Sequence, residues 1–125
     1  MNVVDSSGWL EYFTGGENAK FFVPAIEDTN NLIVPVICVY EVFKRIMVNQ
    51  GVDMAEVRIA DLHKGKIVDL TASLALSAAV ISAELKLPMA DSMILATARA
   101  SNAILWTQDE HFQNLDDVKY IVKTK

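Results

Sequence analysis

The stretch LPMADSMILATARASNAILWTQDEHF, residues 87–112, contains the most readily interpreted run of structural elements in the chain. A proline, Pro88, precedes a segment whose composition and spacing predict a helix that ends near Ala100. Residues 103–106 are apolar and predict a short buried strand. A single turn of helix is expected over residues 109–112. This helix–strand unit is typical of an α/β fold.

The same alternation of elements continues on both sides of this stretch. Further strands are expected over residues 2–4, 32–34, 67–70 and 120–122, the last of them at an edge. Further helices are expected over residues 6–13, 18–28, 35–49, 53–63 and 71–85. Short apolar strands alternating with helices predict one α/β domain, residues 1–125, with a mainly parallel central sheet of four to five strands.

The composition agrees with a single folded domain. The chain has 125 residues, of which 52% are hydrophobic and 22% charged, so it can bury a core. The single cysteine, Cys38, lies in an apolar run and rules out a disulfide within the chain. We see no secretory signal and no apolar run of the roughly 18–20 residues that cross a membrane. We therefore expect a soluble, cytoplasmic protein.

The net charge of −5 argues against a simple nucleic-acid-binding protein, which is usually basic. Basic residues nevertheless gather at three places, namely Lys44 with Arg45, Lys64 with Lys66, and Lys119 with Lys123 and Lys125. A local basic patch can contact phosphates even when the total charge is negative. The net charge therefore does not exclude contact with the phosphates of a nucleic acid.

Four acidic residues interrupt otherwise apolar segments, and these are Asp5, Glu41, Asp91 and Asp109. Asp5 directly follows the first strand, and Asp109 lies three residues beyond the strand at 103–106. Ligands of open parallel sheets bind at the carboxyl ends of the strands. Because an unpaired carboxylate is costly to bury, we expect the fold to bring the four acids together at this rim.

Two of the acids also have a purely structural explanation at the start of a helix. Asp5 could be an N-cap, although Ser6 or Ser7 could cap the same helix and leave the carboxylate free. Asp91 could be an N-cap or an acid of the first helical turn, where the helix dipole favours negative charge. Neither acid identifies a site by itself.

The other two acids have local partners in the sequence. Glu41 could form an ion pair with Arg45, one helical turn later. Asp109 could be a first-turn acid inside a capping box formed by Thr107 and Glu110. The set of four at one rim is more specific than any single member.

Four carboxylates at one place form a site for a hard divalent cation. Mg²⁺ prefers oxygen ligands and keeps several waters, so carboxylates can hold it directly or through water. A bound metal ion lowers the pKa of its water and neutralises charge on phosphoryl oxygens. The pattern therefore indicates a metal-dependent phosphodiesterase. The two histidines and one cysteine cannot build a usual zinc site by themselves.

The chain resembles PIN-domain nucleases, and more narrowly the VapC toxins of bacterial toxin–antitoxin pairs. The resemblance lies in VVDSSGWLEYF (3–13), VPVICVYEVFKRI (34–46) and the stretch 87–112, whose closing TQDEHF matches the family's Thr-x-Asp-x-x-Phe. It implies a three-layer α/β/α fold, a Mg²⁺ or Mn²⁺ site and endoribonuclease activity. The family's acidic positions fall on Asp5, Glu41, Asp91 and Asp109, and its accessory hydroxyl on Thr107. Ser6 is a further polar neighbour.

The chain departs from the family pattern at one place, and the resemblance also implies three partners. Val36 and Ile37 stand where similar sequences often carry a hydroxyl residue before the helical glutamate. The resemblance implies RNA as substrate, a VapB-like antitoxin as inhibitor and a homodimer. An antitoxin would cover apolar surface on the helices that carry five aromatic residues: Trp9, Tyr12, Phe13, Tyr40 and Phe43. The alternative is that these aromatic residues belong to the core, and for most of them we expect the core.

Two other functions fit parts of the sequence. A receiver-like or phosphatase-like α/β domain would use Asp5 to accept a phosphoryl group, but Ser6 and Ser7 follow it where receivers usually add acids. A catalytically inactive PIN-like module would only bind RNA or protein, yet none of the four acids is missing. We therefore expect a metal-dependent ribonuclease that hydrolyses RNA with a metal-activated water.

Overall fold

The computed structural model describes residues 1–124 and has the expected α/β architecture. The strands are β1 (Asn2–Val4), β2 (Leu32–Pro35), β3 (Lys66–Val68), β4 (Ile104–Thr107) and β5 (Val118–Tyr120). The helices are α1 (Ser6–Thr14), α2 (Ala19–Ile26), α3 (Val36–Gln50), α4 (Val52–Leu62), α5 (Ala72–Leu85) and α6 (Met89–Ala100). Two 3₁₀ turns, η1 (Thr29–Asn31) and η2 (Glu110–Phe112), complete the described part.

The five strands form one sheet in the order β3-β2-β1-β4-β5, and every neighbouring pair is parallel. The predicted parallel sheet is thus confirmed, with all five strands present. The predicted bounds of the last strand were wrong, because β5 ends at Tyr120 instead of beginning there. β5 lies at an edge of the sheet, as expected.

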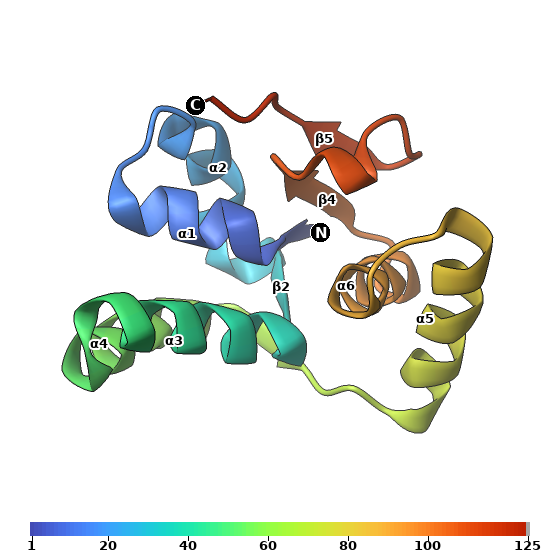
Figure 1. Cartoon of the computed structure of the whole chain (residues 1–125), viewed down its shortest axis with the longest axis horizontal. Helices are drawn as coiled ribbons and strands as arrows, with labels where there is room; N and C mark the ends of the chain where they lie inside the picture. Colours follow the sequence, from blue (N-terminus) through green and yellow to red (C-terminus); the bar gives the residue numbers. More distant parts are fainter. Residues whose placement is uncertain (125) are drawn as a thin grey trace.

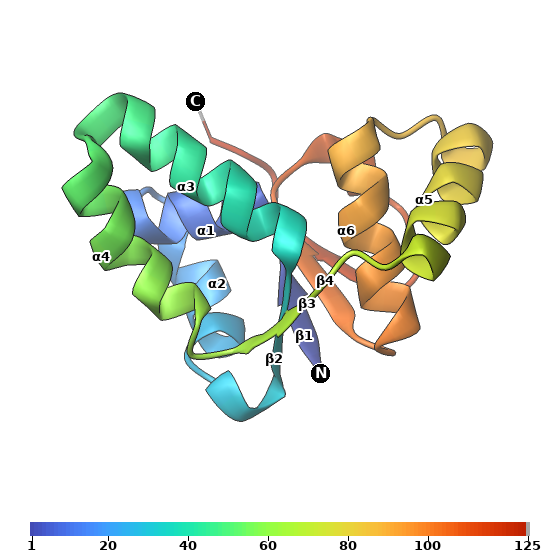
Figure 2. The same ribbon diagram turned by 90° about the horizontal axis from the view of Figure 1, so that it is seen from below.

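Helices cover both faces of the sheet and give the three layers of the predicted fold. Figure 2 shows α1 to α4 on one side of the strands and α5 with α6 on the other. Figure 1 shows the N-terminus beside the central strands and the C-terminus near α2. The position of β2 and β4 between two helical layers explains why these strands are apolar runs without polar alternation.

The strand order reverses direction between β1 and β4. The chain first builds outward from β1 through β2 to β3, and then returns to the other side of β1 as β4. A crevice opens at such a reversal, at the carboxyl ends of the two strands. Asp5 follows β1 and Asp109 follows β4 at this point. The topology therefore brings two of the predicted acids to one place.

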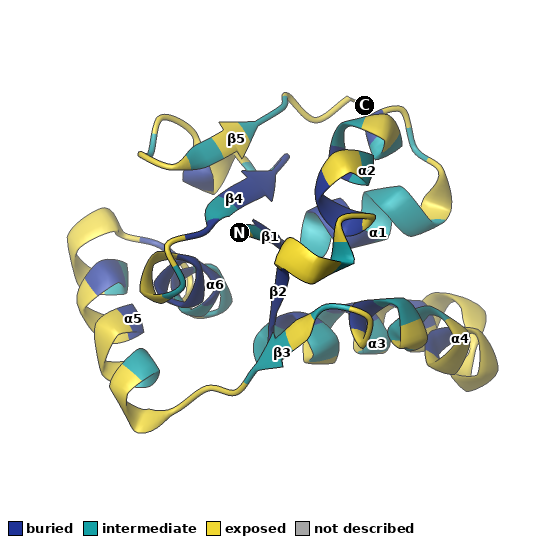
Figure 3. Cartoon of the chain, turned by 180° about the vertical axis from the view of Figure 1, so that it is seen from behind, coloured by how far each residue is buried: buried dark blue, intermediate teal, exposed yellow. Residues whose placement is uncertain are grey.

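The core lies between the sheet and its helices, as the buried residues in Figure 3 show. Val4 of β1, Val34 of β2 and Leu105 of β4 have no exposed surface. Cys38, which lies in an apolar run of the sequence, is equally buried, and its thiol donates to the carbonyl of Val4 at 3.8 Å. The strands that lead to the carboxyl edge of the sheet are therefore packed in the core.

Gly8 allows α1 to pack closely on the sheet. A Cβ at this position would lie 2.6 Å from Val4 Cγ1 and 2.6 Å from Phe22 Cε1, much closer than such contacts normally are. Only glycine permits this approach without movement of the neighbours. Because Asp5 caps this same helix, the packing of Gly8 also fixes the position of the acid.

Helix starts agree with the sequence in part. The helix expected from residue 71 is α5, and Thr71 is its N-cap and accepts a hydrogen bond from the Leu74 amide. The helix expected from residue 53, with Asp53 as its predicted cap, begins at Val52 instead, so that prediction was wrong: Gly51 occupies the N-cap position and Asp53 lies in the first turn. Within residues 1–124, no helix alone has the length and apolar character to cross a membrane. Only α5 and α6 together reach that length, across a bend of 116°.

Candidate metal-binding site

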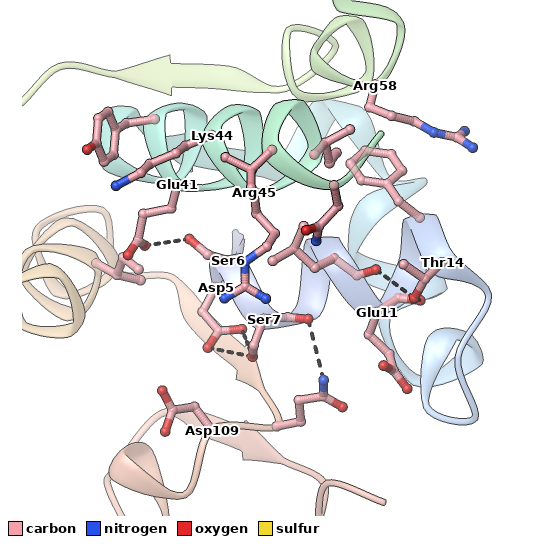
Figure 4. Close-up of a pocket in the computed structure, with 18 of the residues that line it drawn as sticks. Asp5, Ser6, Ser7, Glu11, Thr14, Glu41, Lys44, Arg45, Arg58 and Asp109 are labelled. Carbon is pink, nitrogen blue, oxygen red and sulfur yellow. Dashed lines mark hydrogen bonds between the residues drawn. The ribbon is translucent and has the colours of Figure 1, made fainter. Parts of the chain in front are cut away.

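A pocket of about 790 Å³ opens where β1 and β4 end, and all four predicted acids line it. Its walls come from the length of α1, the middle and C-terminal part of α3, the start of α6 and the loop after β4. Figure 4 shows Asp5 and Asp109 facing each other across the pocket, with Glu41 on the α3 side. Residues separated by up to about a hundred positions in the sequence are therefore neighbours here.

Asp5 is the most deeply buried of the four acids, with only 2% of its surface exposed. Its Oδ1 accepts from the Gly8 amide at 2.9 Å, so Asp5 is itself the N-cap of α1, and neither Ser6 nor Ser7 replaces it. Ser7 Oγ donates to the carboxylate at 2.9 and 3.0 Å. Asp5 therefore caps α1 and also lies in the pocket with the other three acids.

Thr107 connects the ends of β1 and β4. Its hydroxyl donates to Asp5 Oδ2 at 2.7 Å and accepts from the Asp109 amide at 2.9 Å. The parallel register places Thr107 beside Asp5, one residue beyond the Val4–Trp106 pair. Thr107 forms no capping box, because Asp109 is the N-cap of η2 and accepts from the His111 amide at 2.9 Å.

Glu41 points from α3 toward α1 and accepts a hydrogen bond from Ser6 Oγ at 2.7 Å. Within residues 1–124, no ion pair joins Glu41 to Arg45, so the predicted structural alternative is wrong for this structure. Ser6 supplies a hydroxyl to Glu41 although α3 itself begins with Val36 and Ile37. Ser6 is therefore a polar neighbour of Glu41 in this structure.

Asp91 lies in the first turn of α6, and Pro88 occupies the N-cap position, so the first-turn alternative is correct. His111 Nδ1 lies 2.8 Å from Asp91 Oδ2 and 3.1 Å from Asp109 Oδ1. One ligand atom from each of these three side chains lies within 4.8 Å of the others. His111 was not among the residues predicted from the sequence. The available signal was its position two residues after Asp109.

The pocket changes the proton affinity of its acids. Burial raises the pKa of Asp5 to about 7, although hydrogen bonds from Thr107, Gly8 and Ser7 oppose the shift. Burial and the charge of Asp109 raise the pKa of Asp91, while His111 lowers it. The hydrogen bond to Asp91 raises the pKa of His111. Burial and neighbouring negative charge thus destabilise the ionised form of these carboxylates. A cation bound close to them would stabilise that form.

The donor atoms fit a hard divalent cation. The pocket offers carboxylate oxygens from Asp5, Glu41, Asp91 and Asp109, and Mg²⁺ and Mn²⁺ accept such ligands. Asp91 and Asp109 are partly exposed, so an ion could reach them and keep part of its water. The residues present therefore agree with a divalent metal site.

Basic side chains form another wall of the same pocket. Lys44, Arg45, Arg58 and Lys123 line it, and Figure 4 shows Arg45 pointing inward from α3. The other predicted basic residues have different surroundings. Lys64 pairs with Asp61 at 3.1 Å, and Lys119 lies 4.4 Å from the centre of the Trp106 ring. Lys66 does not line the pocket, and Lys125 lies outside the described residues.

The aromatic residues divide between core and surface. Trp9 is fully buried, whereas Tyr12, Phe13 and Phe43 are partly buried against the core. Tyr40 is 59% exposed and lines the pocket together with Phe13. The predicted core position is therefore confirmed for Trp9. Tyr40, in contrast, is accessible to a partner.

Comparison with known proteins identifies the family of the chain and agrees with its fold. The sequence matches the PIN domain over residues 3–118, and the chain therefore belongs to the PIN domain family. Among curated proteins, no sequence match is found.

Solved structures share the fold over nearly the whole chain. A toxin–antitoxin complex from Klebsiella pneumoniae contains a chain with a TM-score of 0.79 and 19% identity, over 95% of this chain and 96% of that one. VapBC2 from Rickettsia felis, bound to a DNA fragment from its promoter, gives 0.74 and 14%, over 95% and 97%. VapC20 from Mycobacterium tuberculosis, a toxin that cleaves the sarcin–ricin loop, gives 0.71 and 16%, over 94% and 98%.

Proposed function

We propose that this protein is a metal-dependent endoribonuclease of the VapC type, the toxin of a toxin–antitoxin pair. The observation that carries the proposal is the convergence of Asp5, Glu41, Asp91 and Asp109 on one pocket. Their oxygens suit Mg²⁺ or Mn²⁺, and a basic wall beside them suits a phosphate backbone. Membership of the PIN domain family supports the same activity.

Each part of the pocket has a role in hydrolysis of a phosphodiester bond. Asp5, Glu41, Asp91 and Asp109 would hold the metal, which when bound supplies a water of lowered pKa and neutralises charge on the phosphoryl oxygens. The carboxylates also orient the water that attacks phosphorus. Thr107 keeps Asp5 and the Asp109 backbone in register.

The basic wall would bind the substrate. Arg45 and Lys44 are exposed on α3 within one turn of Glu41, and Lys123 lines the pocket from the C-terminal segment. Their charges can neutralise backbone phosphates on either side of the scissile bond. An acidic protein can thus bind RNA through a local surface.

Two alternatives have less support. A phosphoryl-accepting aspartate needs an accessible oxygen, but both carboxylate oxygens of Asp5 accept hydrogen bonds and the residue is 2% exposed. An inactive binding module would need no set of four acids in one pocket. We therefore favour the nuclease.

Cleavage of labelled single-stranded RNA by the purified chain tests the proposal. We expect cleavage with Mg²⁺ or Mn²⁺, none with EDTA, and recovery when metal is added back. Binding of RNA without cleavage under every metal condition would favour the inactive module instead.

The proposal includes a cytoplasmic location and two protein partners, a VapB-like antitoxin and a second copy of the chain. The structural neighbours include toxin–antitoxin complexes. Exposed Tyr40 beside the pocket, together with Val48 and Val57 at 70% and 62% exposure, provides apolar surface for an antitoxin helix.

Co-expression with the neighbouring gene product should yield a stable complex that no longer cleaves RNA. Sedimentation of the free protein as a monomer would contradict the homodimer.

A further inference from the structure

The His111 side chain occupies a position that a simple acidic metal site does not require. Its Nδ1 atom lies 2.8 Å from Asp91 Oδ2 and 3.1 Å from Asp109 Oδ1, so it faces both carboxylates at once. The side chain is about half exposed, and the imidazole is not needed for the core. This is a nitrogen donor beside two oxygen donors.

The local backbone explains why His111 points this way. The Asp109 carboxylate accepts from the His111 amide and begins the turn η2, while fully buried Phe112 anchors its other end. The side chain between these two fixed points is directed toward the first turn of α6, where Asp91 lies. The arrangement therefore follows from the short segment Asp109–Phe112 and not from a flexible loop.

The spacing of the three donors suits one cation. Ligands at right angles around an ion, each about 2.1 Å from it, lie about 3.0 Å from each other. The distances from Nδ1 to the two carboxylate oxygens are 2.8 and 3.1 Å. One atom from each residue also lies within 4.8 Å of the other two, which leaves room for a shared ion.

We propose that His111 is a nitrogen ligand of the metal site and that the site therefore favours Mn²⁺ over Mg²⁺. The inference rests on the proposed function, because it concerns the metal of that nuclease. Mg²⁺ is hard and strongly prefers oxygen, whereas imidazole binds first-row transition metals well. One imidazole among carboxylates thus shifts preference toward Mn²⁺ without excluding Mg²⁺.

A different role would leave the metal with oxygen ligands only. His111 could do no more than donate a hydrogen bond to Asp91 and Asp109, and so hold the two carboxylates in place. Its removal would then weaken Mg²⁺ and Mn²⁺ to a similar degree. Direct observation of the ligand atoms separates the two roles.

The chain contains only two histidines, which makes a spectroscopic test unambiguous. His63 is exposed at the end of α4, and its Nδ1 atom lies 3.1 Å from the Ile59 carbonyl oxygen, so His63→Ala is a matched control. We would load wild type, His111→Ala and His63→Ala with one equivalent of Mn²⁺ at pH 8 and record pulsed electron paramagnetic resonance. Calorimetry would give the Kd of each ion.

We expect the nitrogen modulation of a bound imidazole in wild type and in His63→Ala, and its loss in His111→Ala. The Kd for Mn²⁺ should rise about tenfold or more in His111→Ala, and the Kd for Mg²⁺ by less than about threefold. A spectrum without coordinated nitrogen, or equal losses for both ions, would overturn the inference and leave the nuclease intact. Failure to bind either ion, with no RNA cleavage, would overturn both.

Discussion

Asp5 shows how strongly a single residue is controlled by its surroundings. It caps α1, accepts hydrogen bonds from Ser7 and Thr107, and is almost completely buried. Burial raises its pKa from 3.8 to about 7. Without metal, the folded protein therefore holds a proton at Asp5 that the unfolded chain loses at lower pH.

This difference predicts a pH-dependent stability in the metal-free protein. Below about pH 4 the carboxyl is protonated in both states and contributes nothing. As the pH rises toward 7, only the unfolded chain ionises, so the free energy of unfolding falls, by roughly 2–4 kcal/mol in total. Above that pKa the loss is complete. Urea unfolding in EDTA at pH 4 to 8 measures it.

Asp5→Asn isolates this contribution from all other titrating groups. The variant should match wild type near pH 4 and be more stable at pH 8, because an amide carries no charge to bury. Identical pH profiles for the two proteins would show that Asp5 does not titrate as described.

Thr107 is expected to contribute through its hydroxyl. Thr107→Val removes the donor to Asp5 and the acceptor for the Asp109 amide, so stability should fall by about 1–3 kcal/mol and RNA cleavage should drop. Thr107→Ser keeps the hydroxyl and should recover most of both. Equal damage in the two variants would point to packing of the methyl group.

The individual acids could be foreseen, but some of their contacts could not. Asp5 and Asp109 follow strands of a parallel sheet, so their meeting follows from topology. His111 and Asp91 are twenty residues apart, and their contact depends on the direction of one 3₁₀ turn. No periodic pattern encodes that direction. The N-cap role of Asp5 was equally ambiguous, because Ser6 and Ser7 offered the same chemistry.

Among the elements, α1 depends on close packing at Gly8. Gly8→Ala should lower the free energy of unfolding by about 1–3 kcal/mol, because its Cβ would overlap Val4 and Phe22. Ser73→Ala, at an exposed position of α5, should change it by less than about 0.5 kcal/mol. Denaturant titrations of both variants measure the difference. Wild-type stability in Gly8→Ala would contradict this packing.

Helix α3 is expected to bind RNA phosphate through Arg45. Arg45→Ala should raise KM for RNA more than it lowers kcat, and should reduce the slope of log affinity against log salt by about 0.7–1. Lys64→Ala removes one positive charge outside the pocket and serves as the control. Equal effects of the two variants would mean that only net charge matters.

The positions of strands could be predicted where a buried apolar run has a clear end in the sequence. β1 and β2 are buried runs with clear ends, and they lie where the sequence places them. β3 and β5 are three-residue edge strands of intermediate or exposed residues, so their apolar signal is weak and their bounds shifted by up to two residues. Hydrogen bonding to a single neighbour decides such strands more than hydrophobicity does.

For the whole molecule, a metal ion bound in the acidic pocket is expected to stabilise the folded chain. Like charges of several carboxylates destabilise the metal-free state, and an ion that binds only the folded chain stabilises it. An ion at about ten times its Kd should add roughly 1.4 kcal/mol and raise the Tm by about 5 °C. Thermal scans with millimolar Mg²⁺ or Mn²⁺ test this. An unchanged Tm in wild type would count against the site.

Asp91→Asn tests most directly the proposal that these four acids form one metal site that cleaves RNA. Asp91 is partly exposed in the first turn of α6, so the variant should keep its fold, which circular dichroism can verify. The measurement is the initial rate of cleavage of labelled single-stranded RNA at saturating Mn²⁺. We predict a loss of about 100-fold or more relative to wild type. A wild-type rate in the folded variant would contradict the account.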